Sequence, residues 1–261
     1  MTAHNNQGGS INLTAGDRGG CLADASNELT NNQILRALPE PDRRRLIDDL
    51  VPTILVQSTL LANPGEVLRH IVFPTGGVVS LVTGTSEGGS VEAVLIGNEG
   101  VVGSWHAAGV EGAPWRTIVQ AGGPALLMTP EAFKAHVAES PALAQLVVRY
   151  NLAAHLLTSQ SAACNRFHEL AARAARWLLM VCDRTASLEL TLTQEFLAQM
   201  LGAYRPSVTV ALRGLDRAGL VAVSRSRIII LDRPGLEELA CECYAVVRQQ
   251  TADLVQSEGS I

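Results

Sequence analysis

The pattern of residues 191–220 constrains this chain more than any other stretch, because it predicts two short helices joined by a tight turn. The first should run over 193–201, where Thr193 suits the amino-terminal cap and Gly202 suits the left-handed residue that ends a helix. The second should run over 205–218, with a proline in its first turn. Apolar residues repeat at helical intervals through both segments, which predicts the internal packing of a helix-turn-helix.

The side chains expected to face outward at the start of the second helix have the chemistry of DNA contacts. Arginine pairs with guanine through two hydrogen bonds, and serine or threonine hydroxyls reach phosphate or base edges. With the start of the first helix included, the candidate DNA-contacting residues are Thr193, Gln194, Tyr204, Arg205, Pro206, Ser207, Thr209, Val210 and Arg213. A plain helical hairpin would share the apolar spacing, so the flanking sequence has to favour one interpretation.

The flank favours a helix-turn-helix with a wing. Residues 220–223 and 227–231 are strand-like, and the polar turn between them carries Arg225, with Arg227 directly after it. Both arginines suit contact with the phosphate backbone of double-stranded DNA. Residues 204–233 hold six Arg and two Asp, a local net charge of +4, whereas the whole chain has a net charge of -5. This asymmetry is typical of a DNA-binding module on an otherwise acidic protein.

Length and composition set the broader class of protein. With 261 residues, of which 47% are hydrophobic, the chain has room for one large or two modest domains. The five cysteines show no C-x-x-C pair, and Cys241 and Cys243 would lie on different faces of a helix, so we expect free thiols and no metal site. There is no signal-peptide pattern and no apolar run long enough for a membrane span, so we expect a cytoplasmic protein without a membrane partner.

The fold class predicted is α+β, in five segments. Residues 1–27 should be a disordered tail, and 28–140 should form an antiparallel β-roll of the jelly-roll kind after an initial helical stretch. One long helix should span 141–183, followed by the winged helix-turn-helix domain over 184–250 and a tail over 251–261. The β-roll rests on short β-branched runs separated by turn signals, at 53–56, 67–73, 78–83, 91–96, 101–105, 117–121 and 125–128.

The long helix has two apolar sides, which suggests that one packs on the β-roll and the other on a second copy of the chain. One side follows alternating spacings of four and three. It is the predicted dimer interface: Leu143, Val147, Tyr150, Ala154, Leu157, Ser161 and Cys164. The other side is offset and includes Leu152, Ala163 and Phe167. An ordinary core helix is the alternative interpretation.

The order of β-roll, long helix and winged helix-turn-helix resembles the Crp/Fnr family of bacterial transcription regulators. Its motifs here are Asn63-Pro64-Gly65-Glu66, Phe73-Pro74-x-Gly76, Gly97-x-Glu99-Gly100, Leu192-Thr193-Gln194-Glu195 and the turn at Gly202. The resemblance covers about residues 30–245. It implies a homodimer on a palindromic promoter site, with RNA polymerase as a further partner.

The effectors of that family do not transfer readily to this chain. Glu99 and Gly100 begin a match to the cyclic-nucleotide cassette, but the following residues depart from it, and Arg116 stands displaced from the expected position. Thr158 and Ser159 lie about where such receptors touch the base. We therefore expect no cyclic nucleotide and no cofactor, and a sensor domain that is degenerate or binds another ligand.

Two other classes of function can be weighed against a DNA-binding regulator. A cyclic-nucleotide-responsive module acting on a protein partner is the alternative, but such a module needs no winged helix-turn-helix. An enzyme would need a catalytic constellation, and the sequence shows no Ser-His-Asp set, metal-ligand cluster or phosphate-binding glycine loop. We therefore expect no catalytic residues.

Overall fold

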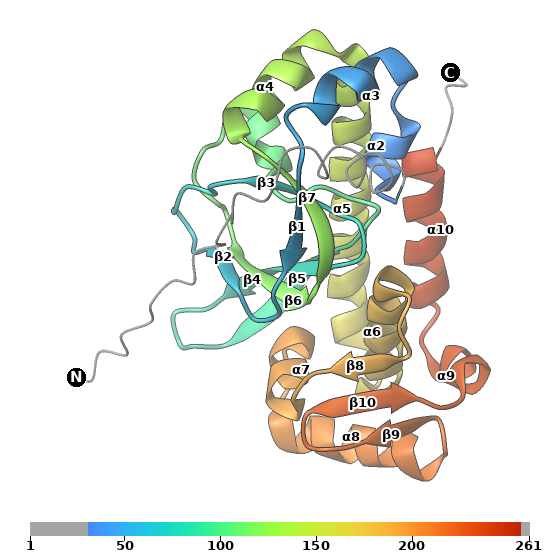
Figure 1. Cartoon of the computed structure of the whole chain (residues 1–261). Helices are drawn as coiled ribbons and strands as arrows, with labels where there is room; N and C mark the ends of the chain where they lie inside the picture. Colours follow the sequence, from blue (N-terminus) through green and yellow to red (C-terminus); the bar gives the residue numbers. More distant parts are fainter. Residues whose placement is uncertain (1–30, 257–261) are drawn as a thin grey trace.

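Two antiparallel sheets packed face to face form the β-roll, as the alternation of short β-branched runs and turns predicts (Figure 1). The computed structural model describes residues 31–256. One sheet has the order β1-β7-β3 and the other β2-β6-β4-β5. The strands are β1 (Val51–Leu55), β2 (Leu60–Ala62), β3 (Ile71–Pro74), β4 (Val78–Gly84), β5 (Ser90–Ile96), β6 (Arg116–Ala121) and β7 (Gly123–Met128). The predicted amino-terminal tail lies outside the described residues.

The strand prediction is wrong at residues 101–105. Val102 makes only a single bridge with Val72, and the chain then turns at Gly103, whose φ of 94° lies in the left-handed region that favours glycine. A 3-10 helix, η1 (Ser104–Ala108), follows. The β-branched run therefore ends at a glycine that the strand pattern did not take into account. Strand β2 is an addition to the predicted set.

Three short helices flank the β-roll: α2 (Gln33–Ala37), α3 (Glu40–Ile47) and α4 (Pro130–Glu139). Asn32 caps α2 by accepting hydrogen bonds from two amides of its first turn. The Nδ2 atom of this fully buried Asn32 also donates to the carbonyl oxygens of Pro74 at 3.0 Å and Gly100 at 2.9 Å. One polar side chain thus anchors the start of α2 to the end of β3 and to the loop after β5.

The single long helix predicted over residues 141–183 is wrong, because the structure has two helices there. Helix α5 (Pro141–Phe167) ends at His168, and α6 (Leu170–Thr185) begins after Glu169. Both intervening residues have extended backbone, with ψ angles of 144° and 145°. Neither glycine nor proline marks this break, and apolar residues continue at helical spacing across it, so the sequence pattern gives no sign of it.

The carboxyl-terminal part contains β8 (Glu189–Thr191), α7 (Gln194–Leu201), α8 (Arg205–Arg217), β9 (Val221–Val223), β10 (Arg227–Ile230), α9 (Arg233–Leu239) and α10 (Cys243–Gln256). Strand β10 lies between β8 and β9, so the wing has a third strand that we did not predict. Helix α10 lies beside α5 and runs past the predicted domain end at residue 250 (Figure 1). Among the described residues, no helix is both long and apolar enough to span a membrane.

The predicted dimer interface on α5 lies largely inside the single chain. Leu143, Val147, Tyr150, Leu157 and Cys164 are all buried within the single chain. Helical spacing identifies an apolar face but does not say which partner covers it. Here α5 contacts α10, the β-roll strand β5 and η1, so the chain itself covers the predicted interface, in which Ala154 and Ser161 are half-buried.

Candidate nucleic-acid interface

The turn between α7 and α8 has the geometry that its sequence predicts. The Thr193 hydroxyl caps α7 by accepting a hydrogen bond from the Phe196 amide at 3.1 Å. Gly202 ends the helix with a φ of 56°, in the left-handed region. Buried Leu201, Val208 and other apolar side chains hold α7 and α8 together. This packing against α7 fixes the position of the first turn of α8.

The first turns of α8 present side chains to solvent rather than to the protein. The Tyr204 side chain is 85% exposed and that of Val210 is 68% exposed, although both are large and apolar enough to be buried. Arg205, Pro206, Ser207 and Arg213 are exposed as well. In helix-turn-helix proteins this end of the second helix enters the major groove.

Two of the candidate residues bind each other. The Thr209 hydroxyl donates to Gln194 Oε1 at 2.7 Å, and its oxygen lies 3.0 Å from the Arg205 carbonyl oxygen, so Thr209 is half-buried. The Gln194 side chain has an amide NH₂ group that can donate elsewhere. The Thr209 hydroxyl therefore orients the Gln194 side chain at the start of α7 and already has this hydrogen-bond partner within the protein.

The start of α8 and the tip of the wing border one hollow. Its lining residues are Thr193, Gln194, Glu195, Arg205, Arg225 and Ser226. The Arg205 Nε atom lies 3.5 Å from a Glu195 oxygen, and both side chains are mostly exposed, so this ion pair contributes little and can open readily.

The two wing arginines differ in their surroundings. Arg227 Nη1 lies 2.9 Å from Glu189 Oε1 on β8, the third strand of the wing. Arg225 has no ion pair among the described residues. Arg225 is therefore the wing arginine with its charge uncompensated by a neighbouring carboxylate.

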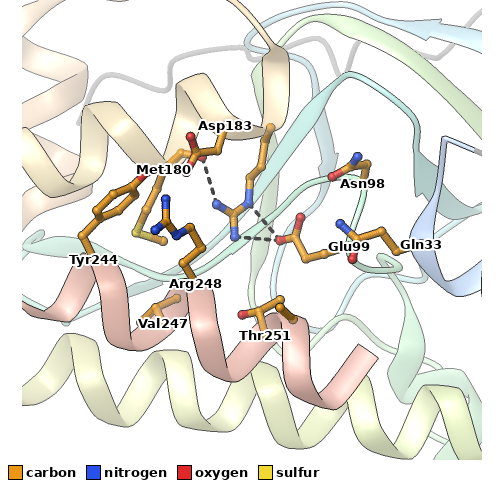
Figure 2. A pocket seen from close by; sticks show the side chains of 11 residues that line it. Gln33, Asn98, Glu99, Met180, Asp183, Tyr244, Val247, Arg248 and Thr251 are labelled. Carbon is orange, nitrogen blue, oxygen red and sulfur yellow. Dashed lines mark hydrogen bonds and ion pairs between the residues drawn. The ribbon is translucent and has the colours of Figure 1, made fainter. Parts of the chain in front are cut away.

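The candidate effector residues of the β-roll already have partners within the protein. Glu99 is buried and accepts from Arg184 of α6 at 2.8 Å and from the Gly97 amide at 3.2 Å. Figure 2 shows this ion pair beside a cavity between α6, α10 and the loop before Gly100. A Cβ atom on Gly100 would lie 2.3 Å from the Tyr150 ring, so that ring fills the space beside it.

The remaining effector candidates do not converge on Glu99. The Thr158 hydroxyl is 2.9 Å from the Ala154 carbonyl oxygen, and the exposed Ser159 hydroxyl is 3.0 Å from that of His155. Arg116 is half-buried on β6 and is not among the residues lining the cavity beside Glu99. Of these five positions, Glu99 alone is among the residues that line that cavity.

A contact that we did not predict joins the β-roll to the helix-turn-helix. Glu92 of β5 accepts from the Ser80 hydroxyl at 2.6 Å and from Trp177 Nε1 of α6 at 3.1 Å. Burial raises the pKa of Glu92 above its ordinary value, although both hydrogen bonds act to lower it. Gln199 of α7 also donates to the Ser90 hydroxyl at 2.9 Å. A glutamate within an apolar strand was the one available signal of this junction.

These features define the architecture of the chain: a β-roll and a long helix that carry a winged helix-turn-helix. Residues 172–239 match the family model of the Crp-like helix-turn-helix domain. The chain as a whole has the fold of Crp/Fnr transcription regulators. No curated protein matches the sequence at a significant level.

Solved structures of similar fold cover most of the chain. A protein from Eubacterium rectale assigned to the Crp/Fnr family of transcriptional regulators is 19% identical, covers 79% of this chain and 96% of its own, and has a TM-score of 0.61. A CRP-family transcriptional regulator from Thermus thermophilus is 21% identical, with coverage of 72% and 96% and a TM-score of 0.60. The c-di-GMP responsive global regulator of Xanthomonas campestris is 15% identical, with coverage of 74% and 99% and a TM-score of 0.58.

Proposed function

We propose that this protein is a sequence-specific transcription regulator that binds a palindromic site in double-stranded DNA as a homodimer. The observation that carries the proposal is the exposed first turn of α8, where Tyr204, Arg205 and Ser207 face solvent on a tightly packed support. Arg225 on the wing adds a cation that suits a neighbouring phosphate. RNA polymerase would be the further partner of such a regulator.

The direct test is selection of bound sequences from random double-stranded DNA by the full-length protein. We expect enrichment of a palindrome whose half-sites are about one helical turn apart, because two copies related by two-fold symmetry would present two α8 helices. The Arg69→Ala variant is a suitable control, since Arg69 is an exposed arginine on the β-roll. Failure to enrich any sequence would refute the proposal.

The homodimer is proposed on the exposed face of α5, opposite the buried one. Val148 is 67% exposed, Leu152 48% and Phe167 76%, and Leu156 and Ala163 lie between them at helical spacing. The described part of the chain leaves this apolar stripe uncovered. Exposed stripes of this kind on a long helix are typical of protein–protein interfaces, and a second α5 offers a matching surface.

We expect Leu152→Lys to weaken the dimer strongly, because two lysines would meet on the two-fold axis among apolar side chains. Sedimentation velocity at micromolar protein concentration measures how much dimer remains. Arg43→Lys, on α3 and therefore outside the proposed interface, is the control. If Leu152→Lys stays dimeric, the interface lies elsewhere on the protein. If Leu152→Lys loses the dimer as expected, its affinity for DNA should fall as well.

We also propose that the β-roll does not bind cyclic AMP through the five candidate residues. The supporting observation is that Glu99 is buried in an ion pair with Arg184 and that Tyr150 fills the space beside Gly100. Calorimetric titration with cyclic AMP should give no binding in the micromolar range. A dissociation constant at or below that range would restore Arg116, Thr158 and Ser159 as candidate contacts.

A further inference from the structure

Four potential metal ligands meet where α5 ends and α10 begins. They are Cys164 in the last turn of α5, His168 directly after that helix, and Cys241 and Cys243 at the junction of α9 and α10. One ligand atom from each residue lies within 4.8 Å of all the others. This is the one such group of cysteine, histidine and acidic residues in the part of the chain that the structure describes.

The expectation that Cys241 and Cys243 point to different sides fails for a simple reason. Helix α9 ends at Leu239 and α10 begins at Cys243, so Cys241 lies in the turn and not on a helix. The helical rule for residues two apart therefore does not apply to this pair. Both thiols turn toward α5, and the Cys241 sulfur lies 3.5 Å from that of Cys164.

The spacing of the ligand atoms fits a single tetrahedral ion. With metal–ligand bonds of about 2.0–2.3 Å, the ligand atoms of a tetrahedral zinc site stand roughly 3.5 Å apart. The Cys164–Cys241 sulfur distance is 3.5 Å, as is the distance from the Cys243 sulfur to His168 Nδ1. An iron–sulfur cluster would place several atoms between its thiolates and would need them further apart.

The outer contacts of the group also suit a metal site. The second nitrogen of His168, Nε2, lies 3.1 Å from a Glu242 carboxylate oxygen, which is the partner that metal-bound histidines commonly have. The Gln160 side chain donates to the Cys243 sulfur at 3.0 Å. Because Glu242 occupies Nε2, the other ring nitrogen of His168, Nδ1, faces the group and lies 3.5 Å from the Cys243 sulfur.

Positive charge lies near the group in two buried arginines of α6, of which Arg173 donates to Asn165 Oδ1, beside Cys164, at 2.8 Å. Three thiolates, one neutral histidine and one divalent ion carry a net charge of about -1. Arg173 and Arg176 are both buried, and the Nε atom of each lacks a hydrogen-bond partner among the described residues. A negatively charged metal–thiolate centre would offset these guanidinium charges, which would otherwise be costly to bury.

We propose that Cys164, His168, Cys241 and Cys243 bind one structural Zn²⁺ ion that fastens the start of α10 to the end of α5. All four positions of the ion are filled by protein side chains, so the site is closed and structural rather than catalytic. Because His168 forms the break between α5 and α6, the ion also holds the point where the long helix joins the DNA-binding part. The site does not depend on the proposed DNA sequence specificity.

The test is the metal content of the full-length protein, purified under reducing conditions from zinc-supplemented cells and measured by mass spectrometry of the elements. We expect one zinc per chain in the wild type and in Cys182→Ala, which removes a buried thiol outside the group. Cys164→Ser and Cys241→Ser should lose the metal. Glu242→Gln should weaken zinc binding about 10–100-fold in competition with a chelator.

Cobalt replacement keeps the proposal testable if the serine variants fail to fold. Wild-type protein loaded with Co²⁺ should show the strong visible absorption of tetrahedral cobalt with thiolate ligands. His168→Cys should keep the metal, since cysteine replaces one ligand by another, and should shift that spectrum toward four thiolates. An unchanged spectrum would remove His168 from the site.

Three results would overturn the proposal. The first is wild-type protein without zinc after purification from supplemented cells. The second is equal zinc content in the wild type and in Cys241→Ser. The third is a Cys164–Cys241 disulfide, or iron with inorganic sulfide, found in place of zinc in wild-type protein purified under reducing conditions.

Discussion

Most candidate contact residues of the helix-turn-helix are exposed to solvent, whereas Glu99 and Gly100 of the β-roll are buried against other parts of the protein. In the helix-turn-helix, Tyr204 and Arg205 face solvent while the apolar residues behind them are packed. In the β-roll, Glu99 is buried against Arg184 and Gly100 lies against the Tyr150 ring. The first region keeps its polar groups available to a partner molecule, whereas the second uses them to hold its own elements together.

This difference shows that residues can match a family motif without being available to bind a ligand. Both regions match family motifs at the level of residue type, but a binding residue also needs hydrogen-bonding capacity that the protein has not already used. Glu99 connects a β-roll loop to α6, so its role in this chain is to join the two regions. Arg205 has one weak exposed partner, Glu195, which a phosphate or base can replace.

The largest expected effect is on the free energy of unfolding, and it separates a buried tyrosine beside the β-roll from an exposed tyrosine in the helix-turn-helix. Tyr150 is buried between α5 and the β-roll, so Tyr150→Ala should cost about 3–5 kcal/mol of unfolding free energy, as for other buried aromatic residues. Tyr204→Ala should change it by less than about 0.5 kcal/mol, because that ring is exposed. Urea denaturation followed by circular dichroism measures both. Similar losses in the two variants would remove the contrast.

A smaller effect should appear in the pH dependence of stability through Glu92. Burial raises its pKa in the folded state, so the folded protein binds more protons there than the unfolded chain. The free energy of unfolding should therefore fall as pH rises from the ordinary glutamate value of 4.5 to the raised one, and then level off.

Glu92→Gln should remove this component, because an amide has no proton to lose yet can still accept from Trp177. Denaturation at several pH values should show the variant gaining on the wild type as pH rises through that window. Glu87→Gln, at an exposed site in the turn before β5, is the control. A wild type and Glu92→Gln whose stabilities run parallel with pH would contradict a raised pKa.

Local signals made much of the fold predictable. Thr193, Gly202 and Pro206 mark the helix-turn-helix by capping and turn chemistry that depends on neighbours in sequence. Most strands of the β-roll also follow from β-branched runs between turn residues. These features could be predicted because each is decided within a few residues of chain.

What the sequence could not supply depends on contacts between distant segments. The break at His168 has no glycine or proline, and the side of α5 that the chain itself covers depends on α10, which follows some eighty residues later. Cys164 and Cys241 meet only because α10 returns along α5. The Glu92–Trp177 contact likewise joins residues 85 positions apart.

The most direct test of the account is the binding of wild type, Arg205→Ala and Arg225→Ala to selected and scrambled duplexes at several salt concentrations. We expect Arg205→Ala to lose about 1–3 kcal/mol on the selected site and little on scrambled DNA, since it removes a base contact. Arg225→Ala should weaken both duplexes alike and flatten the salt dependence, since it removes a phosphate contact. Equal loss on both duplexes for Arg205→Ala would contradict the claim that α8 reads the DNA sequence.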